Sequence, residues 1–237
     1  MAPGSVPVMS GFSSAFERLG AALSAIVLQQ QEALAGYLPR ADWSADLGAR
    51  TYTSGGTTVR VGLLGSYAQR ERTWLWGWAN GQFGPEHPAV VPTLAVREVG
   101  ERLAIPEFTT PELDLSWYRG PAAHGGELIA LAASGVLAGS GYIGAGYDGG
   151  SAYLQVDDDQ VPRAPFDPVP VPALITNAVA LFPGDHRLTL TRFLSHHKVP
   201  FRQKGQTTEV RLPGGGTARA RFDAQGRFSA WEATLRV

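Results

Sequence analysis

Hydrophobic and polar residues alternate along several short stretches of the chain, and this period of two is typical of half-buried strands. The clearest case is residues 73–80, Thr-Trp-Leu-Trp-Gly-Trp-Ala-Asn, which places Trp74, Trp76 and Trp78 at alternate positions. In a strand these three indoles share one face. We therefore predict that they form the main packing face of a sheet and lie on a central strand. The alternative is that they form the wall of a pocket.

The same alternation predicts further strands elsewhere. They cover residues 43–47, 57–67, 141–147, 151–156, 207–212, 217–222 and 227–235. Glycine-rich turns separate several of them. The pattern 43–47 predicts a half-buried strand, whereas residues 112–117 fit either a strand or the start of a helix. In the last strands, apolar and small residues alternate with Arg211, Arg219 and Arg221, which we expect on the outer face of a sheet.

Helical spacing of apolar residues predicts several helices. They cover residues 13–36, 92–103, 127–138 and 185–197. Ser14 and Glu17 have the spacing of a capping box at the start of the first helix. In the second helix we expect Leu94, Val99 and Leu103 to face inward, with Val96 as a further candidate. The third is apolar nearly all round, which indicates a buried helix.

Prolines are dense between residues 157 and 172, where they favour an extended, semi-rigid linker. The sequence thus predicts an α+β protein with four parts. Residues 1–12 form a flexible N-terminus, residues 13–156 a domain with a helix and a twisted antiparallel sheet, residues 157–172 the linker, and residues 173–237 a small basic αβββ domain.

Composition fits a globular protein, since 44% of the 237 residues are hydrophobic and 17% are charged. Charge is divided unevenly along the chain. Residues 1–184 carry 10 Lys and Arg against 17 Asp and Glu, a net −7, while residues 185–237 carry 10 against 4, a net +6. The absence of cysteine excludes disulfides and thiolate chemistry, and it fits a reducing compartment. We see no signal peptide and no membrane-spanning run, so we expect a cytoplasmic protein.

Two glycine patterns, at residues 139–144 and 144–149, match G-x-G-x-x-G. A dinucleotide site requires a strand before this motif and a helix after it, and here a helix precedes and a strand follows. We therefore interpret the glycines as turn residues. The five histidines lack metal-ligand spacing, and the acidic run 157–159 lacks the glycine and glutamate of a calcium loop. We expect no metal and no cofactor.

The leading hypothesis is a non-enzymatic intracellular binding or interaction protein with an aromatic-lined surface near the tryptophan strand. Its candidate residues are Trp76, Tyr142, Tyr147 and Asp148. The partner is a protein or a small molecule. An alternative is a pocket enzyme, in which Asp42, Asp46 and Asp148 converge and act as general acids or bases.

A further alternative is nucleic-acid binding by the basic C-terminal region. Arg211, Arg219 and Arg221 would neutralise phosphates, and Phe228 or Trp231 would stack on a base. The competing interpretations are a solvated face, or a face that docks on the acidic first domain.

Four motifs follow the first predicted helix in a fixed order. They are Trp43 to Asp46, residues 73–80, Ile105 to Pro111 and Tyr147 to Gly150. With these motifs, the chain resembles an uncharacterised bacterial domain family over about residues 13–156. The family is a domain of unknown function, so the resemblance implies no activity and no catalytic residue.

Overall fold

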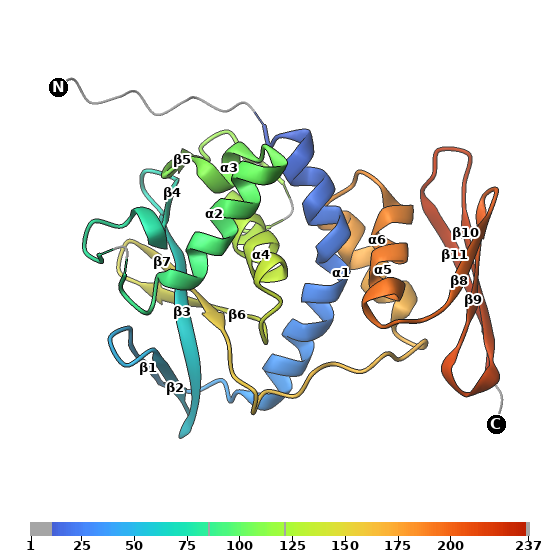
Figure 1. Cartoon of the computed structure of the whole chain (residues 1–237), viewed down its shortest axis with the longest axis horizontal. Helices are drawn as coiled ribbons and strands as arrows, with labels where there is room; N and C mark the ends of the chain where they lie inside the picture. The colour runs from blue at the N-terminus through green and yellow to red at the C-terminus, as the bar shows by residue number, and fades with distance from the viewer. Residues whose placement is uncertain (1–10, 85, 121, 236–237) are drawn as a thin grey trace. The chain divides into compact units, whose positions relative to one another are not determined.

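The computed structural model describes residues 11–84, 86–120 and 122–235 (Figure 1). Nearly all of the predicted flexible N-terminus lies outside the described residues. Contacts divide the chain into two compact units. The first contains the residues up to 16 and residues 30–163, and the second contains residues 17–29 and the chain from residue 164 onward. Helices and two antiparallel sheets confirm the α+β class.

Helix α1 (Ser14–Tyr37) confirms the predicted N-terminal helix. Its cap differs from the predicted Ser14 and Glu17 pair, because the capping residue is Ser13. Both the backbone N–H and the hydroxyl of Ser13 donate to the carboxylate of Glu107, the hydroxyl at 2.7 Å. A carboxylate is favourable at this end of a helix, where backbone N–H groups lack partners. The expected pairing with Glu17, three residues along the helix, is therefore replaced by a pairing with Glu107, which is distant in the sequence.

The sheet of the first unit has seven strands. They are β1 (Trp43–Asp46), β2 (Thr51–Ser54), β3 (Thr57–Ala68), β4 (Thr73–Trp76), β5 (Glu112–Asp114), β6 (Tyr142–Tyr147) and β7 (Gly150–Val156). The order is β1-β2-β3-β4-β5, and β7 joins β3 to β6. The long strand β3 pairs with β2, β4 and β7, so it is the centre of the sheet in place of the predicted tryptophan strand.

The tryptophan stretch is a strand only in its first half. Trp74 and Trp76 are fully buried on β4. The next turn, η1 (Gly77–Ala79), is a 3₁₀ helix, which takes the half-buried Trp78 out of the strand. At Gly77 the backbone carbonyl of Leu63 approaches so closely that a Cβ would not fit. The prediction of one shared face is thus right for two of the tryptophans and wrong for Trp78.

Strand β1 was expected to be half-buried, but all four of its residues are exposed. It lies at the edge of the sheet and pairs only with β2. The alternating pattern predicted a strand correctly. It failed on burial because no described helix or strand is packed over that edge closely enough to cover Trp43, which remains 44% exposed.

Three helices accompany this sheet, α2 (Val91–Leu103), α3 (Pro106–Thr109) and α4 (Gly125–Leu137). Helices α2 and α4 pack on one another and on β3 (Figure 1). Helix α4 is buried, as predicted. The inward face of α2 was predicted only in part. Val96 is buried as expected, together with Thr93 and Gly100, whereas Leu94 and Val99 are half-buried and Leu103 is exposed. Small residues face inward because Phe108 of α3 packs directly against Gly100.

The second unit contains two helices and a four-stranded sheet. These are α5 (Val171–Leu181), α6 (His186–His196), β8 (Phe201–Lys204), β9 (Thr207–Arg211), β10 (Thr217–Phe222) and β11 (Phe228–Thr234), with a short 3₁₀ turn η2 (Pro213–Gly215). The sheet order is β11-β10-β9-β8. The predicted αβββ domain thus omitted helix α5 and strand β8. Strand β8, Phe-Arg-Gln-Lys, has no apolar alternation because it is an exposed edge strand.

One face of this sheet is buried against the helices, and the other is open. The buried face includes Val210, Ala218, Ala220 and Phe222, which pack with Phe193 of α6 in one core. The arginines at the alternate positions are exposed, as predicted. Residues 157–170, most of the predicted linker, form no helix or strand.

Candidate functional site

A continuous cluster of aromatic rings runs from the core of the first unit toward its surface. Trp76 and Trp74 meet edge to face with their ring centroids 5.4 Å apart, and Trp74 lies 5.4 Å from Tyr153. At the outer end, His124 stacks on Tyr67 with centroids 3.7 Å apart and planes 4° from parallel. These rings come from β3, β4, β7 and the residue before α4.

His124 is held by two neighbouring side chains. Its ring lies flat on Tyr67, and its Nε2 is 3.1 Å from the hydroxyl of Tyr153. Its Nδ1 is buried and has no hydrogen-bond partner among the described residues. A buried polar atom without a partner costs about 1–3 kcal/mol, so this ring orientation is maintained at the expense of stability.

The titratable groups of the cluster are held in their neutral forms. Burial lowers the pKa of His124, and the nearby Glu127 carboxylate opposes this in part. Burial raises the pKa of Tyr142 to about 12, with a further contribution from Glu127. The same two causes raise the pKa of Tyr153. At neutral pH, both phenols therefore keep their protons, and the Tyr153 hydroxyl can donate to the imidazole.

A hollow of about 450 Å³ opens beside the stacked rings. It is lined by Tyr67, Gln69, Arg72, Ala123, His124, Gly150 and Ser151. Arg72 adopts a left-handed backbone conformation, φ 57°, and its Nη2 donates to the carbonyl of Tyr118 at 3.0 Å. Arg50, Ala104, Ala138 and Lys198 share this left-handed conformation, and at Arg72 it closes the turn between β3 and β4. The lining offers a guanidinium, an amide and a hydroxyl to a polar ligand, and the imidazole contributes the face of its ring, because its Nδ1 is buried and its Nε2 faces Tyr153.

The structure separates the four residues predicted to share one binding surface. Trp76 is fully buried, and its Nε1–H donates to the carbonyl of Glu107 at 2.9 Å, so its inclusion as a surface residue was wrong. Tyr142 is half-buried and belongs to the cluster, with its ring 6.2 Å from that of Tyr153. Tyr147 and Asp148 lie exposed at the turn between β6 and β7.

Tyr147 borders the hollow, whereas Trp76 does not. A Cβ added to Gly150, which lines the hollow, would lie 2.8 Å from the Tyr147 hydroxyl. Tyr147 is 53% exposed, so it is an accessible aromatic side chain next to the polar lining.

The three carboxylates proposed for acid–base chemistry do not converge. Asp42 precedes β1 and Asp46 ends it, and both are exposed. Strand β1 pairs with β2, which in turn pairs with β3 near Arg60. Asp148 is exposed at the turn before Gly150, which pairs with Ala68. Eight residues of extended strand separate these two positions on β3, or roughly 26 Å. A shared catalytic site built from these carboxylates is therefore ruled out.

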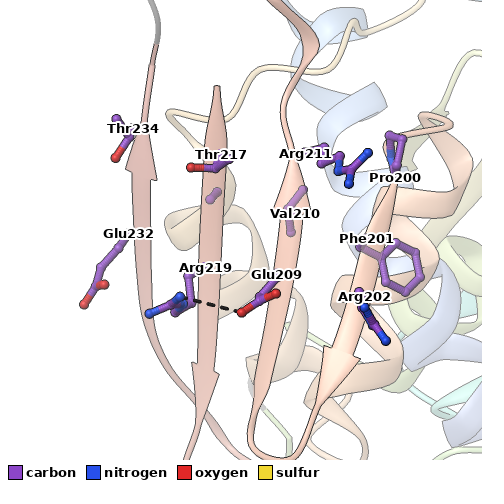
Figure 2. A pocket seen from close by; sticks show the side chains of 11 residues that line it. Pro200, Phe201, Arg202, Glu209, Val210, Arg211, Thr217, Arg219, Glu232 and Thr234 are labelled. Atoms are coloured by element: carbon purple, nitrogen blue, oxygen red, sulfur yellow. Dashed lines mark ion pairs between the residues drawn. The ribbon is translucent and has the colours of Figure 1, made fainter. Parts of the chain in front are cut away.

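A second hollow, of about 790 Å³, lies over the open face of the C-terminal sheet (Figure 2). Two of the predicted anion-binding arginines have partners there. Arg219 pairs with Glu209 at 3.6 Å, and Arg221 pairs with Glu232 at 2.9 Å. Arg211 forms no ion pair with any described residue.

A model of a protein family matches residues 17–159 and is described as "Family of unknown function (DUF6882)". The chain belongs to this family. Comparisons with curated proteins and with solved structures found no match. The resemblance inferred from the sequence is thus confirmed at the level of a family of unknown function. Every residue that lines the 450 Å³ hollow lies inside the DUF6882 region, whereas the open sheet face lies outside it.

Sequence reasoning missed the central residues of the DUF6882 hollow. His124 was considered only among the five histidines that lack metal-ligand spacing, and Tyr67 and Arg72 were not singled out. They become neighbours only because β3 pairs with β7 and α4 begins beside them. The left-handed Arg72 follows the polar turn Gln69-Arg70-Glu71, but no signal in the sequence distinguishes it from the other turn residues.

Among the described residues, no three metal-ligating side chains are close enough to hold an ion. The acidic run 157–159 instead binds the protein itself, since Asp157 pairs with Arg60 at 3.2 Å and Asp158 accepts from the backbone N–H of Arg60 at 2.8 Å. No helix in the described ranges combines the length and the hydropathy needed to cross a membrane.

Proposed function

We propose that this DUF6882 protein is a non-enzymatic binding protein whose site is the hollow beside His124. The ligand class is a small polar molecule with a negatively charged group. The observation that carries the proposal is the face-to-face stack of His124 on Tyr67 at the edge of a cavity that also contains Arg72. This arrangement joins a rigid aromatic wall to a guanidinium that forms charge-assisted hydrogen bonds.

The charge of the lining supports an anionic ligand. Arg72 contributes a permanent positive charge, and no Asp or Glu is among the lining residues. Gln69 and Ser151 supply neutral donors and acceptors on either side. Glu127 influences the pKa of His124 without lining the hollow, and its carboxylate accepts a hydrogen bond from the N–H of Ala123 at 3.0 Å.

The protonation states favour recognition over catalysis. A general acid or base works best when its pKa is near the operating pH. Burial raises the pKa of both Tyr142 and Tyr153 above the ordinary tyrosine value, so these phenols stay protonated, and the Tyr153 hydroxyl holds the ring of His124 in place. The exposed Tyr147 adds apolar area at the rim for the uncharged part of the ligand.

We place this activity in the cytoplasm, because a chain with no cysteine among 237 residues fits a reducing compartment. We further propose that the Thr-Trp-Leu-Trp-Gly-Trp-Ala-Asn stretch is a signature of a bacterial family, since two of its tryptophans form the inner end of the aromatic cluster.

Thermal unfolding with a panel of small carboxylates and phosphomonoesters tests the proposal. One class of compound should raise the Tm of the wild-type chain by several degrees, because a ligand that binds the native state stabilises it. Arg72→Asn should abolish this shift, since asparagine tolerates the left-handed conformation but lacks the guanidinium. The matched control is Arg70→Gln, an exposed residue of the same turn that does not line the hollow.

The control variant should keep the full shift. A panel without effect, or a shift that survives in Arg72→Asn, would contradict the proposed site. Recovery of the bound compound after prolonged incubation separates binding from turnover. Mass spectrometry should return it unchanged, and a chemically altered product would refute the non-enzymatic part of the proposal.

A further inference from the structure

The open face of the C-terminal sheet carries an excess of positive charge. Its exposed cations are Arg202 and Lys204 on β8, Arg211 on β9, and Arg219 and Arg221 on β10. Its exposed carboxylates are Glu209 and Glu232. Figure 2 shows Arg219 beside Glu209, and Arg202 and Arg211 on the β8–β9 side of the sheet.

Ion pairing leaves this excess on one side of the face. Glu209 and Glu232 neutralise Arg219 and Arg221 through the two ion pairs already described. Arg202, Lys204 and Arg211 form no ion pair with any residue in the described ranges. Among the three arginines expected to bind an anion, Arg211 thus remains without an ion pair to a described residue, together with Arg202 and Lys204 on β8.

These three side chains form a strip along β8 and β9, which we call the β8–β9 strip. Arg202 and Lys204 are two residues apart on one strand, so they project from the same face about 6.8 Å apart. Arg202 pairs in register with Glu209, and Arg211 lies two residues beyond Glu209 on the same face. The three charges are thus spaced one after another along a line instead of converging on a point.

We propose that the β8–β9 strip binds the phosphodiester backbone of single-stranded nucleic acid, independently of its base sequence. Spaced cations match the repeating charges of an extended strand, whereas a small anion requires donors that converge. All charged residues that line the hollow with Arg202 and Arg211 are exposed, and the lining residues come from all four strands of the sheet. Half-buried Phe201 packs on the core beside its register partner Val210, so the strip recognises phosphates through charge alone.

A protein partner fits this face less well. The centre of a protein interface is usually depleted of charge and contains aromatic or aliphatic anchors. Here the outward positions of β9 and β10 hold only Thr207, Glu209, Arg211, Thr217, Arg219 and Arg221. The net charge of +6 over residues 185–237 likewise favours a polyanion.

Fluorescence anisotropy of a labelled twenty-nucleotide oligo-dT with the full chain tests this proposal. At 50 mM salt the wild type should bind, and the triple variant Arg202→Gln, Lys204→Gln, Arg211→Gln should bind at least tenfold more weakly. The slope of log Kobs against log salt should also become shallower by about 2, because each lost phosphate contact on a single strand contributes about 0.7.

The matched control removes three positive charges away from the sheet, with Arg70→Gln, Arg102→Gln and Arg192→Gln, all exposed. It should retain binding within about threefold, and circular dichroism should show both variants folded. Absence of binding at 50 mM salt, equal binding by the strip variant and the wild type, or an equal loss in the control would overturn the proposal. Competition by polyglutamate as effective as that by oligo-dT would also overturn it, and would assign the strip to an acidic protein.

Discussion

The indole N–H of Trp76 donates a 2.9 Å hydrogen bond to the backbone carbonyl of Glu107, and both residues are fully buried. The carboxylate of the same Glu107 accepts hydrogen bonds from Ser13, which caps α1. Within the first unit, one glutamate thus connects the tryptophan strand to the start of the N-terminal helix. This relationship explains why Trp76 is part of the core and not of a binding surface.

Replacing Trp76 by alanine should lower the free energy of unfolding by about 3–5 kcal/mol, because the change leaves a large cavity and an unpaired carbonyl. Urea denaturation measures this loss. The control Trp43→Ala, at a 44% exposed indole on β1, should cost about 1 kcal/mol or less. Equal losses in the two variants, or loss of ligand binding in the folded fraction of Trp76→Ala, would contradict the assignment of Trp76 to the core.

Glu107→Gln should destabilise the protein by about 1–2 kcal/mol, because it removes the negative charge that accepts two hydrogen bonds at the start of α1. The comparison variant is Glu17→Gln, which tests the capping box expected from the sequence. Glu17 is exposed, and the cap of α1 is Ser13. Its replacement should therefore change the urea midpoint very little. A larger effect at residue 17 than at residue 107 would favour the local capping box.

Gly65→Ala should destabilise the fold by about 1–3 kcal/mol through overpacking. A Cβ at this position would lie 2.6 Å from both the carbonyl oxygen of Leu75 and the Cζ2 atom of Trp74. Gly146→Ala is a suitable control, since a Cβ there meets nothing within 4 Å. Thermal denaturation should lower the Tm of the first variant by several degrees and leave the second near the wild type. Comparable Tm values for both would show that the indole moves aside easily.

Stability should fall as the pH decreases from 7.5 to 5.5. Burial lowers the pKa of His124, His186 and His197 below the unfolded value of about 6.5. Between the folded and unfolded pKa values, the unfolded state binds more protons, so protonation favours unfolding. The stability that the three neutral histidines contribute is fully present above about pH 6.5 and is lost as the pH falls through their folded-state pKa values. Urea midpoints at pH 8.5 and 7.5 should agree, and the midpoint at pH 5.5 should be lower.

Replacing all three of these histidines by glutamine should flatten the pH dependence in that window. The carboxyls of Asp114 and Asp223 also have lowered pKa values, through hydrogen bonds from Ser116 and Arg227 respectively, but they titrate at more acidic pH. A wild-type midpoint that stays constant or rises toward pH 5.5 would contradict the prediction.

Elements whose packing follows their own period were predictable from the sequence. Helix α1 and strand β10 each present a regular apolar face, and Asp185 caps α6 as expected, with its carboxylate 2.8 Å from the N–H of Leu188. The predictions were wrong where the conformation of a segment depends on a neighbouring element. Trp78 leaves the strand because β3 crowds Gly77, and β8 carries no apolar pattern because it lies at an edge.

The candidate site was less predictable than the fold, because its parts are distant in sequence. Tyr67 and Ser151 become partners only through the register of β3 with β7, and β3 has three neighbouring strands. The pattern of one strand does not reveal which neighbour it takes. Tyr142, which was selected as a binding-surface residue, has its ring near that of Tyr153 in the aromatic cluster. Selecting Trp76 relied on aromatic content alone, which does not distinguish a core from a surface.

The most direct test of the central claim is nitrogen NMR of the histidine rings, recorded with and without the compound that raises the Tm. The account predicts that His124 titrates below pH 6.5 in the free protein and that its ring resonances shift on ligand addition, while those of His197 in the second unit do not. Unchanged His124 resonances in the presence of a stabilising ligand would contradict a binding site at the hollow that His124 and Tyr67 enclose.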